Sequence, residues 1–360
     1  MKLNGQTYRS VWRDPDGAIR IFDQTLLPWR VEILRLTDAT QVAEAISTMR
    51  VRGAPLIGAV AAFGLALSLR TDASDAAMEA TASMLAATRP TAINLRWALQ
   101  KLLEGLRNQP RDARVAIADG IAQAIADDDV ETNRRIGEHM LPLIEAHAGK
   151  GQVNILTHCN AGWLATVDYG TALSGIFQAH DAGIAVHVWV DETRPRNQGA
   201  LLTAFELAGH GVAHTIVADN AGGHLMQRGH VDFCIVGTDR VTRNGDVANK
   251  IGTYLKALAA KDNDVPFHVA CPHSTIDWQV ARGADIPIEE RSAAEVTDIT
   301  GQAPDGSLAR IRVASPGSQA ANPAFDVTPA RLVSSIITER GAAEASEAGL
   351  LALYPERRTS

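Results

Sequence analysis

Ionisable and nucleophilic side chains recur directly after strand-like apolar runs in the second half of this sequence. A thiol is a nucleophile and a carboxylate can give or take a proton, so these residue types suit covalent or acid–base chemistry. Any one of them is also explained as a helix cap or a core residue, but several at one place favour a site. The segments that follow the five apolar runs are 157–162 (THCNAG), 191–195 (DETRP), 219–220 (DN), 237–240 (GTDR) and 271–272 (CP).

Cys159 is the candidate nucleophile among the three cysteines. It follows an apolar run and precedes an expected helix start, a position that tends to expose the sulfur and lower the thiol pKa. A buried structural role stays open for Cys159 from its position alone. Cys234 lies inside an apolar run and is expected in the core. The cysteines, each on or beside an apolar run, do not form a disulfide framework.

Cationic side chains precede three expected helices. Arg52 and Gly53 lead into a helix expected at 56–69, where glycine permits close backbone approach and the helix N-terminus offers unpaired N–H groups. Arg89 and an expected N-cap, Thr91, precede the helix expected at 92–107. Asn249-Lys250 stands at the start of the helix expected at 250–261. Each alone is explained as a capped helix with a solvated charge. In a chain of net charge −7 the three together favour a phosphorylated small molecule as ligand.

The elements that must position these residues differ between the two halves of the chain. Strand-like pieces at 8–12 and 19–23 are followed by apolar segments with helical spacing. After residue 150, continuous β-branched runs alternate with helical segments, which is typical of a parallel sheet built from βαβ units. Ligands bind beyond the carboxyl ends of the strands in such a sheet, where the reactive side chains lie. The expected helices are 39–49, 56–69, 73–87, 92–107, 113–128, 130–146, 169–181, 201–210 and 250–261, and the later strands are 153–157, 185–190, 214–218, 233–236 and 267–270.

These patterns predict an α/β protein of two domains. Residues 1–128 form an N-terminal, mostly helical domain with a small β-sheet, and residues 129–360 form a C-terminal Rossmann-like domain with a parallel sheet. Aspartates 127–129 mark a turn or helix start between them.

Composition excludes several classes of protein. The chain has 360 residues, 46% hydrophobic and 21% charged, without a block of Lys and Arg, which argues against a nucleic-acid partner. The longest apolar run, 56–69, is too short to span a bilayer, and the polar N-terminus does not resemble a signal peptide. We therefore expect a cytoplasmic protein with reduced thiols.

Familiar cofactor and metal signatures are missing from the sequence. It contains no G-x-G-x-x-G, Walker loop, H-E-x-x-H, C-x-x-C or G-x-S-x-G. His210 and His214 are four residues apart, but His214 opens an expected strand, so a helical metal face is not expected.

Seven segments, spread over nearly the whole chain, form a recognisable pattern. They are 52–55 (RGAP), 89–95 (RPTAINL), 157–162 (THCNAG), 191–195 (DETRP), 237–241 (GTDRV), 244–246 with 249–253 (NGD, NKIGT) and 322–329 (NPAFDVTP). In this order they resemble the methylthioribose-1-phosphate isomerase family. One departure is Thr238-Asp239-Arg240-Val241, where the family usually reads Ala-Asp-Arg-Ile, a change that preserves size. Residues 341–360 match no motif.

The resemblance implies a homodimer without metal or organic cofactor, and it assigns roles to particular residues. The family's catalytic cysteine matches Cys159 and its acid–base aspartate matches Asp239. The residues that match its substrate-binding set are Arg52, Gly53, Ala54, Arg89, Gln198, Asn249 and Lys250.

The implied reaction is the aldose–ketose isomerisation of S-methyl-5-thioribose 1-phosphate to S-methyl-5-thioribulose 1-phosphate, a step of methionine salvage. The C1 phosphate blocks the free aldehyde, so the ring must open with the phosphate attached. Asp239 would need a raised pKa to act as the acid, and Cys159 would either relay a proton or stabilise a hydride shift. Related isomerases of the same fold act on ribose 1,5-bisphosphate and 5-deoxyribose 1-phosphate, and a side activity on the latter is expected. The alternative from another class is a non-catalytic regulatory subunit like those of the translation-initiation guanine-nucleotide exchange factor, which would lack the Cys and the Asp.

Overall fold

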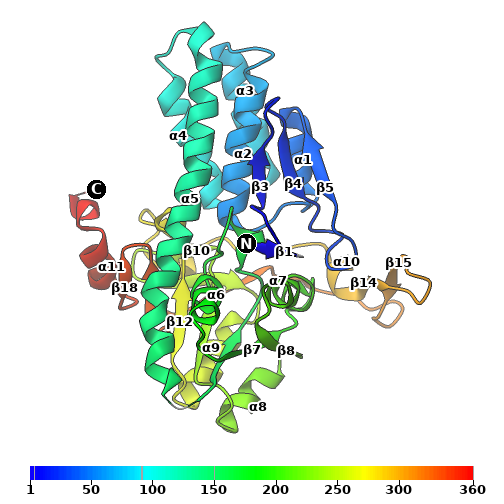
Figure 1. Ribbon diagram of the computed structural model, residues 1–360, viewed down its shortest axis with the longest axis vertical. Coiled ribbons are helices and arrows are strands. Elements are labelled where there is room, and N and C mark those ends of the chain that lie inside the picture. The colour runs from blue at the N-terminus through cyan, green and yellow to red at the C-terminus, as the bar shows by residue number, and fades with distance from the viewer. Residues whose placement is uncertain (4, 91, 150, 360) are drawn as a thin grey trace.

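The N-terminal part consists of helices beside a small antiparallel sheet (Figure 1). The computed structural model describes residues 1–3, 5–90, 92–149 and 151–359, so the N-cap expected at Thr91 lies outside the described residues. Strands β3, β4 and β5 pair in that order, and a short pair, β1 and β2, precedes them. The elements of this part are β1 Lys2–Leu3, β2 Gln6–Thr7, β3 Val11–Arg13, β4 Ile19–Phe22, β5 Ile33–Leu36, α1 Ala39–Ser47, α2 Ala54–Ser68, α3 Asp75–Thr88 and α4 Ile93–Leu106.

Helix α2 is the centre of this part, because it is apolar on every side and buried on every side. Every residue from Leu56 to Leu67 is buried. Two glycines let its neighbours approach closely: a Cβ at Gly64 would stand 2.6 Å from Val42 Cγ1, and one at Gly58 would stand 2.9 Å from the main-chain oxygen of Asn94. This packing fixes the N-terminal end of α2, which faces the rest of the molecule.

Helix α5, Arg111–Ala148, is continuous through the position where a turn or helix start was expected. The prediction at aspartates 127–129 is wrong because these carboxylates are used in tertiary contacts instead of capping a helix. Asp127 pairs with Arg9 at 2.6 Å, and Asp129 accepts a hydrogen bond of 2.7 Å from the Val167 N–H. The helix packs on α2 with one half and on the second part with the other (Figure 1). The domain division at 128/129 stays a prediction.

A seven-stranded sheet forms the core of the second part, in the order β18-β17-β12-β9-β6-β7-β8. All its pairs are parallel except β17 with β18, which confirms the predicted parallel sheet. Three predicted strands have the expected bounds and two are shifted by one residue. The strands are β6 Val153–Thr157, β7 Val186–Asp191, β8 Ala213–Val217, β9 Phe233–Val236, β12 Phe267–Ala270, β17 Ser335–Thr338 and β18 Gly341–Ala343.

The chain order reverses between β6 and β9. From β6 the sheet grows through β7 and β8 on one side and through β9, β12 and β17 on the other. Ligands of such sheets bind at this switch point, beyond the carboxyl ends of the strands. The flanking helices are α6 Ser174–Asp181, α7 Ala204–His210, α8 Ala221–Gln227 and α9 Thr253–Asp262, with α11 Glu347–Leu353 near the C-terminus.

A four-stranded sheet, β13-β10-β11-β16, extends the second part. It corrects the prediction for Asn249 and Lys250, which lie on β11 rather than at a helix start. Their strand pairs with β10 on one side and β16 on the other, with Asn249 opposite Asp326, and α9 begins only after Gly252. The strands are β10 Arg240–Thr242, β11 Val247–Lys250, β13 Ile276–Asp277 and β16 Phe325–Thr328.

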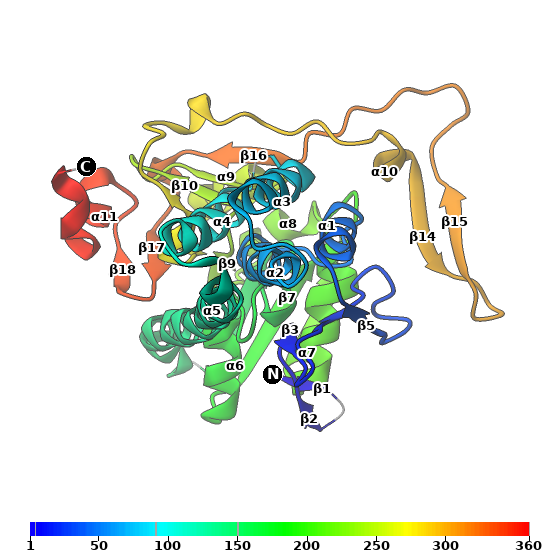
Figure 2. The ribbon, with the colours of Figure 1, turned by 90° about the horizontal axis from the view of Figure 1, so that it is seen from above.

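A two-stranded arm projects from the body of the molecule beyond the short helix α10, Ala294–Thr297 (Figure 2). It consists of β14, Asp298–Gln302, and β15, Leu308–Arg312. Within the part of the chain that is described, no helix has both the length and the apolar composition needed to cross a bilayer.

Candidate active site

Cys159 follows β6 and is held by its main chain. Its N–H donates to Thr193 Oγ1 at 2.8 Å, and its carbonyl accepts from Thr203 Oγ1 at 2.8 Å. Its φ of 69° is in the left-handed region, which is unusual for a residue other than glycine and is enriched at functional sites. All three cysteines are free.

The expectation of a lowered thiol pKa at Cys159 is wrong. Only a short 3-10 turn, Trp163–Ala165, follows, and α6 begins later, so the α-helix expected to start directly after Cys159 does not form there. Burial raises the pKa of Cys159, and the nearby charges of Arg52 and Lys250 oppose that shift. Burial therefore favours the neutral form of the Cys159 thiol, although two cationic side chains lie near it.

Asp239 follows β9, and close packing of two strand-end loops brings it near Cys159. A Cβ at Gly237 would stand 2.6 Å from Ala161 Cβ, so glycine is required where the loops meet. Desolvation raises the pKa of Asp239, while Lys250, Arg89 and Arg52 oppose the shift. The raised pKa expected from the sequence is confirmed in direction.

The three candidate phosphate-binding cations come from three separate elements. Arg52 precedes α2, is 8% exposed and donates to Asn160 Oδ1 at 2.7 Å. Arg89 directly follows α3 as its C-cap, and its buried Nε has no hydrogen-bond partner among the described residues. Lys250 ends β11 and donates to the Ala324 carbonyl at 2.9 Å. Burial lowers the pKa of each, and Asp239 opposes that shift in all three.

The remaining candidates lie around these groups. Gly53 caps α2 with a φ of 96°, and a Cβ there would stand 2.3 Å from the Ala165 carbonyl oxygen, so only glycine fits. Gln198 has a buried Oε1 without a hydrogen-bond partner among the described residues, and Asn249 donates to Thr253 Oγ1 at 3.0 Å. Unpaired buried polar atoms are costly, so Gln198 Oε1 and Arg89 Nε mark where a polar ligand would bind. The structure brings all nine candidates to the wall of one cavity: Arg52, Gly53, Ala54, Arg89, Cys159, Gln198, Asp239, Asn249 and Lys250.

A buried polar cluster adjoins the cavity, and His158 of this cluster is part of the cavity wall. His158 Nδ1 is 2.9 Å from Asp191 Oδ2, and its Nε2 is 2.8 Å from the Ile251 carbonyl oxygen. Lys256 Nζ is 3.2 Å from the same Asp191 oxygen. Asp219 completes the group of His158, Asp191 and Asp219 whose atoms could hold a metal, but its oxygens accept the N–H groups of residues 193 and 194. The Lys256 ammonium supplies the positive charge here, so the cluster is an ion-pair network suited to holding the strand ends.

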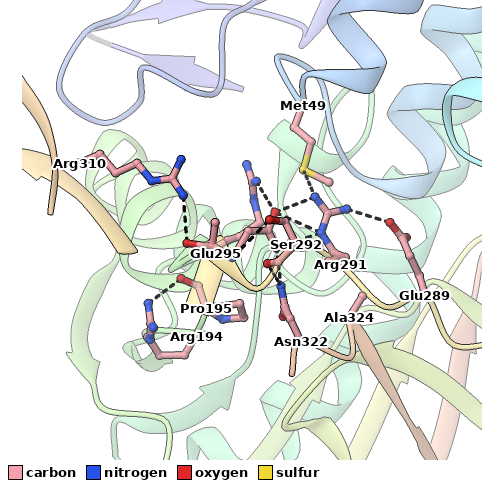
Figure 3. Close-up of polar contacts among 12 residues, drawn as sticks. Met49, Arg194, Pro195, Glu289, Arg291, Ser292, Glu295, Arg310, Asn322 and Ala324 are labelled. Atoms are coloured by element: carbon pink, nitrogen blue, oxygen red, sulfur yellow. Dashed lines mark hydrogen bonds and ion pairs between the residues drawn. The ribbon is translucent and has the colours of Figure 1, made fainter. Parts of the chain in front are cut away.

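Sequence reasoning missed two arginines of the cavity wall, Arg196 and Arg291. Both are held by Glu295. Arg196 Nη1 lies 2.9 Å from its carboxylate, and Arg291 Nη2 lies 2.8 Å from it (Figure 3). Asn322 Nδ2 donates to Glu295 at 2.9 Å, and Arg291 also contacts the Met49 sulfur at 3.6 Å. These ion pairs lower the pKa of Glu295 to about 2. In the sequence, the charged run 289–295 (EERSAAE) was the signal from which Arg291 and Glu295 could have been found.

Comparison with known proteins agrees with this fold. Residues 50–345 match the model of the initiation factor 2 subunit family. The methylthioribose-1-phosphate isomerase of Gluconobacter oxydans is 64% identical over 99% of both chains, and that of Methylobacterium nodulans is 65% identical over 99% of both.

Two solved structures extend the comparison. The 5-methylthioribose 1-phosphate isomerase of Pyrococcus horikoshii has a TM-score of 0.84 and 40% identity, covering 98% of this chain and 97% of its own. A structure from A. fulgidus described as the delta subunit of translation initiation factor eIF-2B has a TM-score of 0.80 and 35% identity, covering 97% and 100%.

The fold and the cavity together define the class of this protein. It is an α/β protein with a Rossmann-like sheet and a cationic cavity at the switch point of that sheet. The chain belongs to the initiation factor 2 subunit family, within its group of methylthioribose-1-phosphate isomerases.

Proposed function

We propose that this protein isomerises S-methyl-5-thio-D-ribose 1-phosphate to S-methyl-5-thio-D-ribulose 1-phosphate in methionine salvage. The full-length isomerase relatives support this aldose–ketose activity. The observation that carries it is the common cavity of Cys159, Asp239 and three cations, which combines an acid, a thiol and a phosphate site.

Substrate binding follows from the charges of the cavity. Arg52, Arg89 and Lys250 bind the C1 phosphate, together with the N-terminal N–H groups of α2 at Gly53-Ala54. Gln198 and Asn249 orient the ribose hydroxyls. This arrangement places the phosphate and C1 beside the reactive side chains.

Asp239 then acts as the acid and the base. It donates its proton to the ring oxygen, the C1–O4 bond breaks, and C1 becomes an electron-deficient centre that still carries the phosphate. Hydrogen moves from C2 to C1, C2 becomes the ketone carbon, and the Asp239 carboxylate recovers a proton from the C2 hydroxyl. C1 is reduced and C2 oxidised by two electrons each, so no external oxidant or reductant is needed.

Two routes for the C2 hydrogen remain as proposals. In one, Cys159 relays it as a proton. In the other, it moves as a hydride while Cys159 stabilises the cationic transition state. The raised pKa of Cys159 supports the hydride route, because a neutral thiol is a poor base.

The alternative function is a non-catalytic regulatory subunit that binds a sugar phosphate or a protein partner. The similarity to the A. fulgidus structure supports this alternative. Cys159 and Asp239, both facing one cavity, support the enzyme instead. Incubation with methylthioribose 1-phosphate while the ketose carbonyl is followed tests the choice: turnover supports the isomerase, and tight binding without turnover supports the regulatory function.

We further propose a cytoplasmic homodimer that requires no metal or organic cofactor, binds no nucleic acid and has a side activity on 5-deoxyribose 1-phosphate. The absence of a Lys and Arg block supports the exclusion of nucleic acid. Exposed apolar side chains, Ile311 on the arm and Ile216 on edge strand β8, support self-association. Light scattering at micromolar concentration tests the dimer, and a stable monomer would contradict it.

A further inference from the structure

Glu206 is a buried carboxylate on α7, and the loop that follows β6 is folded around it. The residue is 1% exposed. Its Oε2 accepts from the Trp163 N–H at 2.7 Å. Its Oε1 accepts from the Leu164 N–H at 3.3 Å and from Asn160 Nδ2 at 2.7 Å. A Cβ at Gly162 would stand 1.9 Å from Glu206 Oε2, so the loop lies directly on the carboxylate. An ionised carboxylate only accepts hydrogen bonds, which matches these three donors.

Asn160 links this carboxylate to the phosphate site, because the two ends of its amide have opposite hydrogen-bonding character. Besides Glu206, Nδ2 donates to Thr203 Oγ1 at 3.1 Å. The Thr203 hydroxyl spends its own proton on the Cys159 carbonyl, so its oxygen can only accept from the amide. Both partners of Nδ2 therefore require a donor there. The other end of the amide, Oδ1, then faces Arg52 and accepts from its Nη1 at 2.7 Å.

We propose that Glu206 is a positioning residue for substrate binding: it fixes the orientation of the Asn160 amide and, through that amide, the Arg52 guanidinium that binds the C1 phosphate. This inference rests on the proposed function, because it concerns the phosphate site of the same cavity. Glu206 lies outside the described wall of that cavity, whereas Asn160 and Arg52 belong to it. Glu206 therefore acts through Asn160 and not by touching the substrate.

The substitution Glu206→Gln shows how this control would fail. It turns one of the two acceptor atoms into a donor. The main-chain N–H of Trp163 cannot turn, so the new amide offers its oxygen to Trp163 and its NH2 group to Asn160. The Asn160 amide then turns round to accept that hydrogen bond, and its own NH2 group faces the Arg52 guanidinium, donor against donor. Arg52 loses its hydrogen bond to Oδ1.

Two effects of this substitution on phosphate binding have opposite signs. Burial lowers the pKa of Arg52, and the negative charge of Glu206 is among those that oppose this shift. Removing that charge would by itself make the site more positive and tighten anion binding. Losing the orientation of Arg52 would weaken it, by about tenfold or more for one hydrogen bond to a charged group. The direction in which KM changes therefore separates positioning from a simple effect of charge.

The test measures KM and kcat for methylthioribose 1-phosphate, and Kd for inorganic phosphate by calorimetry. The proteins are the wild type, Glu206→Gln, Asn160→Asp, the double variant that combines both, and Glu145→Gln, an exposed control on α5. In the double variant the carboxylate and the amide exchange places, so a donor faces an acceptor again and the total charge is unchanged. We expect KM and Kd to rise about tenfold in both single variants with little change in kcat, to return toward the wild-type values in the double variant, and to stay unchanged in the control.

An unchanged or lower KM in folded Glu206→Gln would overturn the positioning role, and so would a double variant that binds no better than the single ones. A purely structural role would lower the folded fraction, and with it the apparent kcat, but would leave KM unchanged. A wild type that binds phosphate without turning over the sugar would contradict the proposed function, and Kd would still decide the role of Glu206. If Glu206→Gln does not fold, Asn160→Ala takes its place, because it removes the link and keeps the carboxylate; the same rise in KM is expected, and an unchanged KM would overturn the proposal.

Discussion

Arg52 donates to Asn160 twice, to Oδ1 at 2.7 Å and to the main-chain oxygen at 2.9 Å. The arginine belongs to the N-terminal part and Asn160 follows Cys159 directly, so this pair joins the phosphate site to the thiol. Asn160 Nδ2 in turn donates to Glu206 Oε1 at 2.7 Å. The guanidinium is thereby fixed before a substrate binds.

Arg52→Lys should weaken substrate binding more than it slows chemistry. Lysine cannot make the two-pronged contact with Asn160, and hydrogen bonds to charged groups contribute about 1.5–3 kcal/mol, so KM should rise by at least about tenfold. Arg30→Lys, at a 65% exposed side chain, is the matched control. Steady-state kinetics check this, and an unchanged KM would contradict the role of Arg52.

Alkylation should inactivate the protein through Cys159. The raised thiol pKa predicts slow reaction at pH 7 and faster reaction at pH 9, and substrate should protect. Cys234 and Cys271 are fully buried and should stay unmodified in the folded protein. Mass spectrometry of the inactivated protein checks this; activity lost with Cys159 intact would show the assignment to be wrong.

Stability should fall as pH rises toward 7 because of Glu206. Burial raises its pKa from 4.5 to about 7, so between these values the folded state binds more protons than the unfolded state. The free energy of unfolding then decreases with rising pH and levels off above about 7. Urea unfolding of the wild type and Glu206→Gln at pH 5.5 and 8 measures this, and the variant should lose less stability over that interval. An equal loss in both proteins would exclude Glu206 as the cause.

Turnover in D2O should leave C1 of the ketose without deuterium. A hydride moves directly from C2 to C1, whereas a proton relayed by Cys159 would exchange with solvent. Proton NMR of the product distinguishes the two, and deuterium at C1 would establish the relay.

The parallel sheet could be predicted from the sequence because each strand is a short apolar run, and so could the positions of Cys159 and Asp239 beyond the carboxyl ends of their strands. The catalytic roles of these two residues stay predictions. The surroundings of these two residues could not be predicted. Asn249 and Lys250 looked like a helix start because β11 is recognisable only through its pairing with β10 and β16. The pKa of Cys159 depends on burial between segments distant in sequence. Arg196 and Glu295 are 99 positions apart and meet only in the folded chain.

The central claim, that Asp239 is the acid–base group of an isomerase, is tested most directly by the kinetics of Asp239→Asn. The substitution keeps the size of the side chain but removes the group that gives and takes the proton. Binding should survive because cations hold the phosphate, so the account predicts a nearly unchanged KM and a turnover number lower by about 10²-fold or more, measured as ketose formed from methylthioribose 1-phosphate. A raised KM with near-normal turnover at saturation would contradict it and make Asp239 a residue that only positions the sugar.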